Sequence, residues 1–147
     1  MDGITNNSIE AVRQWFRTCP LLNGERVGVN YIGDRATSFA VVASPSAIST
    51  HQNVLGEDIP DDIQQLNFSF AATDAYGADI LVNASVQKLY DDIVQWILDQ
   101  NSARRFPDLR HLGAVRSVTP TLTAYPSQVG ADTAVYRIQL KIMYRRY

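Results

Sequence analysis

The sequence predicts an α+β domain in which two helices pack on one face of a mainly antiparallel sheet. Three observations favour this fold class. Residues 133–147 alternate apolar and polar side chains almost without interruption, as a half-buried strand does. Residues 66–72 alternate in the same way, and residues 82–97 carry apolar side chains at helical spacing. At 147 residues the chain can bury the core of one domain, and no repeat or linker divides residues 1–147.

The N-terminal part predicts a helix followed by two short strands. Asn6 or Asn7 can cap the helix, and Glu10 stands three residues after Asn7, which is the spacing of a capping box. The helix should end at Cys19, because the residue before Pro20 disfavours the α region. Residues 21–24 then predict a turn, and residues 27–32 and 38–43 predict the strands.

Residues 44–64 predict a long loop or hairpin arm, since they are mostly polar and are interrupted by Pro45, Gly56 and Pro60. Within them, residues 48–54 are candidates for a strand. A connection of about twenty residues exceeds an ordinary loop, and connections of that length are usually functional or mobile.

The C-terminal half predicts a long helix and two more strands. The helix runs over residues 79–101 and buries an apolar stripe made of Val82, Val86, Leu89, Ile93, Val94 and Ile97. Residues 115–124 form a strand in which Pro120 marks a sheet edge or a bulge, and residues 125–132 connect it to the last strand. At about 3.3 Å per residue the last strand spans roughly 50 Å, so we expect it to outrun its sheet and leave backbone groups unpaired.

Charge is divided unevenly along the chain. Residues 1–103 hold 13 acids and 5 bases, a net charge of −8, whereas residues 104–147 hold 2 acids and 8 bases, a net charge of +6. One interpretation is a mixed, solvated surface. The other is a polar molecule whose acidic arm meets the basic side of an identical neighbour, a contact that builds rings or filaments. The candidate interface residues are Glu57, Asp58, Asp61, Asp62, Arg104, Arg105, Arg110, Arg116, Arg137, Lys141 and Arg145.

No pattern in the sequence indicates an enzyme, a metal site or a cofactor. His51 and His111 lie sixty residues apart without metal-ligand spacing, and we expect both on the surface. Cys19 follows a helix C-terminus, where the dipole raises a thiol pKa, so we expect a buried packing residue. The carboxylates of residues 57–62 lack EF-hand spacing, and the chain has neither a glycine-rich phosphate cradle nor a GxSxG elbow.

Other classes of protein are also disfavoured. No apolar run approaches the length of a membrane span, and the N-terminus lacks the features of a signal peptide. A single cysteine suits a reducing cytoplasm. The basic C-terminal third with its tyrosines is typical of base-stacking proteins, but Tyr136 and Tyr144 alternate onto the apolar face and the pI is about 5.6. A small nucleic-acid-binding module therefore remains the less favoured alternative.

Five segments carry a family resemblance: WFRTCPLLNG at residues 15–24, VNYIG at 29–33, NFSFA at 67–71, YGAD at 76–79 and DTAVYRIQLKIMY at 132–144. In this order they resemble the minor capsid, or tail-terminator, proteins of tailed, siphovirus-like phages and prophages of Gram-positive bacteria. The resemblance extends from the first predicted helix to the last predicted strand. It rests on structural residues, because the family has no catalytic signature.

The resemblance implies a structural role in the virion, at the head–tail junction, after assembly in the bacterial host cytoplasm. Such subunits form a homo-oligomeric ring, a hexamer in the family, that caps the tail tube and docks the head. The implied partners are other copies of the chain, the tail tube protein and a head-completion or connector protein. A minor capsid or head-completion connector is the alternative within the virion. The basic residues would face either a neighbouring subunit or DNA passing through the lumen.

Overall fold

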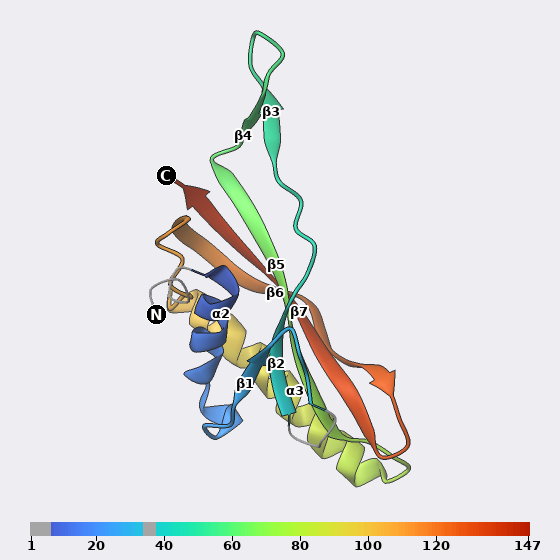
Figure 1. Cartoon of the computed structure of the whole chain (residues 1–147). Helices are drawn as coiled ribbons and strands as arrows, with labels where there is room; N and C mark the ends of the chain where they lie inside the picture. Colours follow the sequence, from blue (N-terminus) through green and yellow to red (C-terminus); the bar gives the residue numbers. More distant parts are fainter. Residues whose placement is uncertain (1–6, 34–37) are drawn as a thin grey trace.

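The computed structural model describes residues 7–33 and 38–147 and confirms the α+β class. A five-stranded sheet has the order β1-β2-β5-β7-β6, and a separate two-stranded hairpin, β3-β4, projects beyond it as an arm (Figure 1). All strand pairs are antiparallel except β1 with β2. The elements are α2 (Ser8–Arg17), the 3₁₀ helix η1 (Pro20–Leu22), β1 (Val27–Val29), β2 (Ser38–Ala43), β3 (Thr50–Gln52), β4 (Asp58–Pro60), β5 (Ile63–Ala75), α3 (Ile80–Ser102), β6 (Gly113–Val129) and β7 (Thr133–Arg146).

Strand β7 lies in the interior of the sheet. Its side chains alternate between buried and half-buried from Thr133 to Ile142, which confirms the predicted strand. The expectation that this strand outruns its sheet is wrong. Residues 133–145 pair with β5 and residues 134–146 pair with β6, so both edges of β7 are occupied along its length. Both edges are paired because β5 and β6 are longer than the strands that the sequence predicts at residues 66–72 and 115–124.

Strand β6 is the edge strand that Pro120 predicts. Its register against β7 shifts at four places, one of them between Pro120 and Leu122. Pro126 lies in the same strand, inside the region predicted to be a connection. Prolines and bulges are tolerated at an edge because its outer backbone groups have no neighbouring strand to pair with.

The first helix begins where its cap predicts. The Asn7 side chain accepts hydrogen bonds from the backbone N–H groups of Ile9 and Glu10, at 2.9 and 3.3 Å. Glu10 does not complete a capping box, because its carboxylate binds Arg13 and Gln14 instead, each at 2.8 Å. Asn6, the other candidate cap, lies outside the described residues. The helix ends at Arg17, and Pro20 starts η1.

The second helix starts after Asp79, which caps it, and ends within a residue of the predicted position. Its buried residues are Tyr90, Ile93, Val94 and Ile97, with Val86 and Leu89 partly buried. Val82 was predicted to lie in the buried stripe, but it is exposed. Ile80 and Leu81 precede it in the first turn and are also exposed, since this end of α3 lies at the lower end of the sheet (Figure 1).

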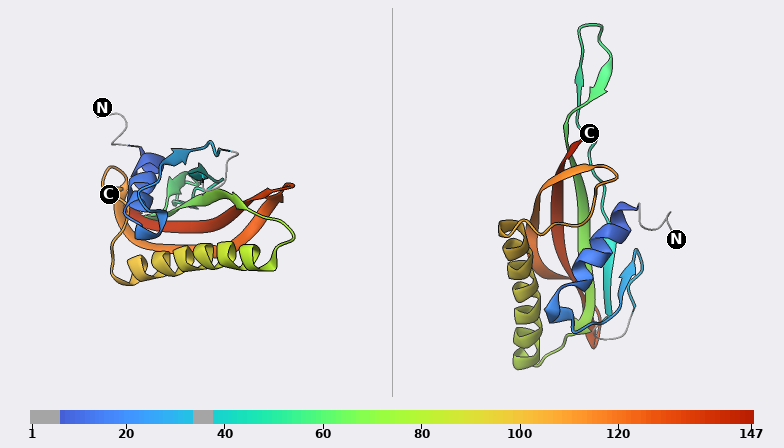
Figure 2. Two further views of the ribbon diagram at one scale, coloured as in Figure 1. Left: turned by 90° about the horizontal axis from the view of Figure 1, so that it is seen from below. Right: turned by 90° about the vertical axis from the view of Figure 1, so that its left-hand side faces the viewer.

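Both helices cover the same face of the sheet and touch each other. Phe16 of α2 stacks on Phe70 of β5, and Tyr90 of α3 stacks on Tyr136 of β7, with ring centroids 4.6 and 5.2 Å apart. Trp15 of α2 meets Trp96 of α3 at 4.8 Å. The right-hand view of Figure 2 shows α2 in front of the strands and α3 running alongside them. No described helix packs on the opposite face, which we call the open face.

A buried polar contact fixes the middle of α3 to the sheet. The Tyr90 hydroxyl donates a 2.7 Å hydrogen bond to Oδ2 of Asp74, near the end of β5. Oδ1 of the same carboxylate accepts from the Ala75 N–H at 2.8 Å. Both side chains are buried, and burial together with the neighbouring carboxylate raises the pKa of Tyr90 strongly. A buried carboxylate is tolerated here because both of its oxygens are hydrogen-bonded.

Replacing Tyr90 with phenylalanine should lower the free energy of unfolding by about 1.5–3 kcal/mol, because Asp74 loses a hydrogen bond and stays buried. Urea unfolding followed by circular dichroism measures the change. Tyr125→Phe is the matched control, since the Tyr125 hydroxyl has no hydrogen-bond partner among the described residues, and it should leave the transition unchanged. Equal midpoints for Y90F and the wild type would contradict this assignment.

Candidate functional site

The arm is the most prominent feature of the molecule and confirms the predicted hairpin. Every residue of β3 and β4 is exposed, and the hairpin forms a sheet of its own (Figure 1). An isolated two-stranded hairpin is marginally stable in water. Its order therefore depends on local hydrogen bonds at the tip and at the base.

The tip is held by one asparagine. The Asn53 carboxamide oxygen accepts from the backbone N–H groups of Leu55 and Glu57, at 2.9 and 3.0 Å. Its backbone accepts from Gly56 N–H and donates to Glu57 C=O, each at 3.0 Å. Gly56 has φ +80°, a conformation that glycine adopts without steric cost. These contacts close the turn and leave Val54 and Leu55 outside it, fully exposed and 77% exposed respectively.

The base of the arm is tied to the sheet through Gln64. Its side chain is buried, accepts from Ser49 N–H at 3.0 Å and donates to the carbonyls of Ser49 and Asp61, each at 2.8 Å. The Asp61 carboxylate accepts from the Ser49 hydroxyl and from His51 Nδ1, the latter at 2.6 Å. These two contacts hold the pKa of Asp61 below its usual value.

The predicted acidic residues divide into two groups. Asp61 is engaged inside its own chain by Ser49 and His51, as described above. Glu57 and Asp58 near the tip, and Asp62 at the base, form no ion pair with any described residue. These three side chains are therefore available to an external partner.

The predicted basic residues divide in the same way. Arg110 forms a two-point ion pair with Asp108, at 2.9 Å for both contacts, so its charge is neutralised locally. Arg104 lies over the ring of Phe106, 5.7 Å from its centroid. The others have no ion-pair partner within residues 7–33 and 38–147: Arg105, Arg116, Arg137, Lys141 and Arg145.

Three of these free cations lie on the open face. Arg137, Lys141 and Arg145 alternate with the buried residues of β7 and therefore point away from the helices. Their cross-strand neighbours contain no carboxylate: Ala71 and Tyr125 flank Arg137, Asn67 and Thr119 flank Lys141, and Ile63 and Ala114 flank Arg145. The open face is thus basic along β7.

A groove lies at the junction of the two helices. It has a volume of about 570 Å³ and is lined by Trp15, Thr18, Pro20, Trp96, Gln100, Arg105 and Phe106. Its wall is fixed to α2, because Trp15 Nε1 donates a 2.8 Å hydrogen bond to the Arg105 carbonyl. Among the described residues that line the groove, Arg105 carries the charge. We call this feature the tryptophan groove; its volume falls in the range of ordinary binding pockets.

The chain after α3 turns sharply at the edge of this groove. Arg104 N–H binds Asn101 C=O and Arg105 N–H binds Gln100 C=O, at 3.1 and 2.9 Å, which is a Schellman cap. Arg104 occupies the left-handed position of this cap, with φ +57°. Glycine is usual at this position, and any residue with a side chain raises the conformational free energy there by about 1 kcal/mol. A strained residue of this kind is more common at functional sites than elsewhere.

The residues expected to lack chemistry are placed as follows. Cys19 is buried, and burial raises the pKa of its thiol. His51 and His111 are exposed; His111 Nε2 lies 3.3 Å from the Ser8 hydroxyl. In the part of the chain that the structure describes, no three His, Cys, Asp or Glu side chains gather to hold a metal ion. None of the described helices combines the length and the hydropathy of a membrane span.

The sequence predicts the arm but neither its apolar tip nor the tryptophan groove. The composition of residues 48–54 indicates a strand, which the structure confines to Thr50–Gln52, and does not indicate that Val54 and Leu55 are exposed. An apolar pair between Asn53 and Gly56, in an otherwise polar stretch, was the available signal. The groove had no local signal, because its two tryptophans are eighty-one residues apart.

Comparison with known proteins finds no matching family model and no matching curated protein. The resemblance to tail-terminator proteins therefore stays a prediction from the sequence.

Replacing Asp61 with asparagine should loosen the arm, because the contacts from Ser49 and His51 favour the ionised carboxylate. Since the folded-state pKa is lowered, this stabilisation is present above the unfolded value of about 4 and is lost as the pH falls through the folded value. The amide NMR resonances of residues 50–60 should move toward random-coil positions in D61N at neutral pH, and in the wild type only in acid. Asp62→Asn is the control, and identical spectra for D61N and D62N would contradict the assignment.

Proposed function

We propose that this protein is a structural assembly subunit that joins copies of itself through its projecting arm. The observation that carries the proposal is the tip, where Val54 and Leu55 are held in solvent by a closed hydrogen-bonded turn. Exposed apolar side chains on an ordered projection, rather than scattered over a surface, are typical of a contact surface. The free carboxylates beside them add charge selectivity.

The arrangement of charge supports a contact between unlike surfaces. Glu57 and Asp58 lie at the end of the arm, whereas Arg105 lines the tryptophan groove and Arg137 and Lys141 lie on the open face. Arg145 pairs across from Ile63 at the base of the arm, and Arg116 is exposed on β6. An arm that meets a basic surface makes a head-to-tail contact, which generates a ring when the rotation closes. Exposed ion pairs contribute about 0–1 kcal/mol each, so they select the partner while apolar area supplies most of the affinity.

The particular assembly that we propose is the ring at the head–tail junction of a tailed phage. The sequence resemblance to tail-terminator proteins supports this choice, and the α+β fold is of the class that the resemblance implies. In such a ring the chain would act without catalysis, would contact the tail tube and the head-completion protein, and would reside in the virion. The open basic face would meet a neighbouring subunit or the DNA in the lumen.

Native mass spectrometry over a concentration series tests self-assembly. We expect a hexamer whose population falls as salt is raised, because screening weakens the contacts between exposed charges that add to the apolar contact. The variant Glu57→Lys, Asp58→Lys, Asp62→Lys should remain monomeric with an unchanged circular dichroism spectrum; Asp61 is kept because it holds the arm. The control reverses three exposed acids outside the arm, Glu25, Asp91 and Asp132, and should assemble normally. Normal assembly of the arm variant would contradict the proposal that these charges guide the contact.

Deletion of the gene from the phage genome that encodes it tests the role in the virion. We expect filled heads and separate tail tubes of uncontrolled length, visible by negative-stain electron microscopy, because nothing would stop tube growth or dock the head. Tails of normal length beside heads that have lost DNA would favour the head-completion connector instead. Normal infectious particles would overturn both roles.

A further inference from the structure

We propose that the tip of the arm binds in the tryptophan groove of a second copy of this chain, with Val54 and Leu55 inserted between the helices and Glu57 and Asp58 facing Arg104 and Arg105. This inference rests on the proposed self-assembly and names the surface that receives the arm.

The tip has the properties of an anchor. Its turn is already closed by Asn53, so binding would order little additional backbone. Val54 and Leu55 are adjacent, apolar and exposed, and nothing in the described chain covers them. Strongly bound interfaces usually place a few such side chains in pockets on the partner.

The groove has the complementary properties. Three aromatic side chains, those of Trp15, Trp96 and Phe106, supply apolar walls, and about 570 Å³ is room for two aliphatic side chains. Its walls are preformed, since the Trp15 indole N–H donates a hydrogen bond to the Arg105 carbonyl and the Trp15 ring lies 4.8 Å from that of Trp96 at a tilt of 45°. Docking would therefore remove apolar surface from water on both partners without rearranging either one.

The charges agree with the same pairing. Glu57 and Asp58 follow the apolar pair after Gly56 and have no ion-pair partner among the described residues. Arg105 lines the groove, and Arg104 lies over Phe106 at its rim. Arg104 keeps a left-handed backbone conformation that glycine would adopt more easily, so the fold does not require arginine at that position.

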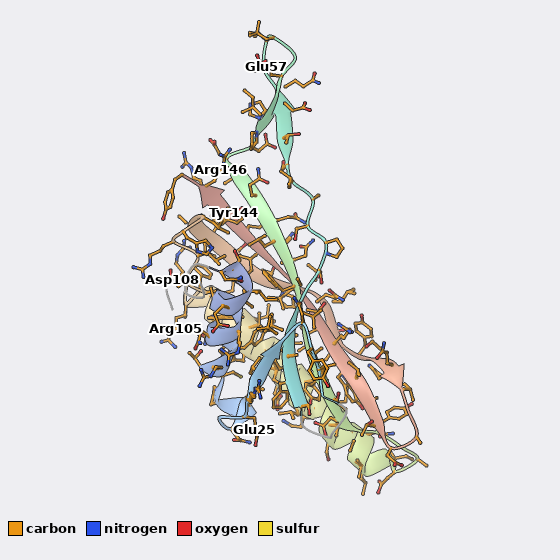
Figure 3. The ribbon with its side chains drawn as sticks, viewed as in Figure 1. Glu25, Glu57, Arg105, Asp108, Tyr144 and Arg146 are labelled. Carbon is orange, nitrogen blue, oxygen red and sulfur yellow. The ribbon has the colours of Figure 1, made fainter. Side chains whose placement is uncertain are left out.

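The arm and groove of one molecule are far apart. Figure 3 shows Glu57 near the end of the arm and Arg105 on the helix layer, well away from it. The base of the arm is fixed by Gln64 and Asp61, so the arm is held in this direction. The open face has a hollow of about 650 Å³ at the base of the arm, lined in part by Ile63, Gln65 and Met143. It is a poorer receptor for the tip, because it has no aromatic wall and because Asp61 and Asp62 in its lining would repel Glu57 and Asp58.

The decisive experiment places a benzophenone amino acid at position 55 of the full chain. Unlabelled and ¹⁵N-labelled copies are mixed at about 1 mM, where even a millimolar affinity leaves a large fraction bound, and are then irradiated. Peptide mass spectrometry should identify mixed-isotope cross-links from position 55 to residues 15–20 or 96–106. The same probe at Leu81, which is equally exposed at the other end of the molecule, is the control and should not label the groove.

The possible results separate this inference from the proposed function. Cross-links from position 55 to another surface of a stable oligomer would overturn the docking site and leave self-assembly intact. Cross-links within one copy, or none at all with a monomeric protein, would overturn both.

Variants provide a second measurement that a merely structural effect would not reproduce. Both tryptophans of the chain line the groove, so intrinsic fluorescence against concentration reports its occupancy. Leu55→Asp should raise the protein concentration at the midpoint of the fluorescence change about tenfold or more, and Ile80→Asp should leave that concentration unchanged.

The charged residues are tested separately. Arg104→Gly should weaken association while the melting temperature stays the same or rises. Arg105→Glu should also weaken it, and addition of Glu57→Arg in the same chain should restore it; failure of this charge exchange would contradict the pairing.

Discussion

Pairing of β7 along both edges is the constraint on which the rest of the structure depends. Thirteen consecutive residues of β5 pair with it on one side, and β6 follows it on the other through several register shifts. Because side chains alternate along a strand, this register places Tyr136, Ile138 and Leu140 on one face. A slip of one residue would bury Arg137 and Lys141, so the apolar alternation of β7 selects a single register for the whole sheet.

One-sided burial follows from that register and determines where surfaces remain for other molecules. Both helices are needed on the apolar face, and their aromatic side chains meet there, with Trp15 against Trp96 and Phe16 against Phe70. The opposite face keeps its cations. Where the two helices diverge at the C-terminal end of α3, the aromatic contacts no longer fill the space, and the tryptophan groove results. The core and the groove are therefore built from the same aromatic cluster.

Much of the fold could be predicted because its signals are local. The alternation of β7, the bounds of β2, the Asn7 cap and the edge position indicated by Pro120 each depend on a few neighbouring residues. What the sequence did not reveal depends on tertiary contacts. The length of β5 comes from pairing of polar residues such as Gln65 with β7. The bond between Tyr90 and Asp74 joins two elements, and the exposure of Val54 is known only once the arm leaves the sheet.

The direction of the arm links this fold to the kind of assembly that it can form. A contact between an arm and a groove joins two different surfaces, so each added copy exposes a new arm and a new groove until the rotation closes. In the proposed role the ring must close, because an open helix of subunits would continue the tube instead of ending it. The angle of each step would be set at the base of the arm, where Gln64, Ser49 and Asp61 hold the hairpin against the end of β5. Under the proposed role, these buried and local hydrogen bonds decide whether a ring closes, although none of them lies at the interface itself.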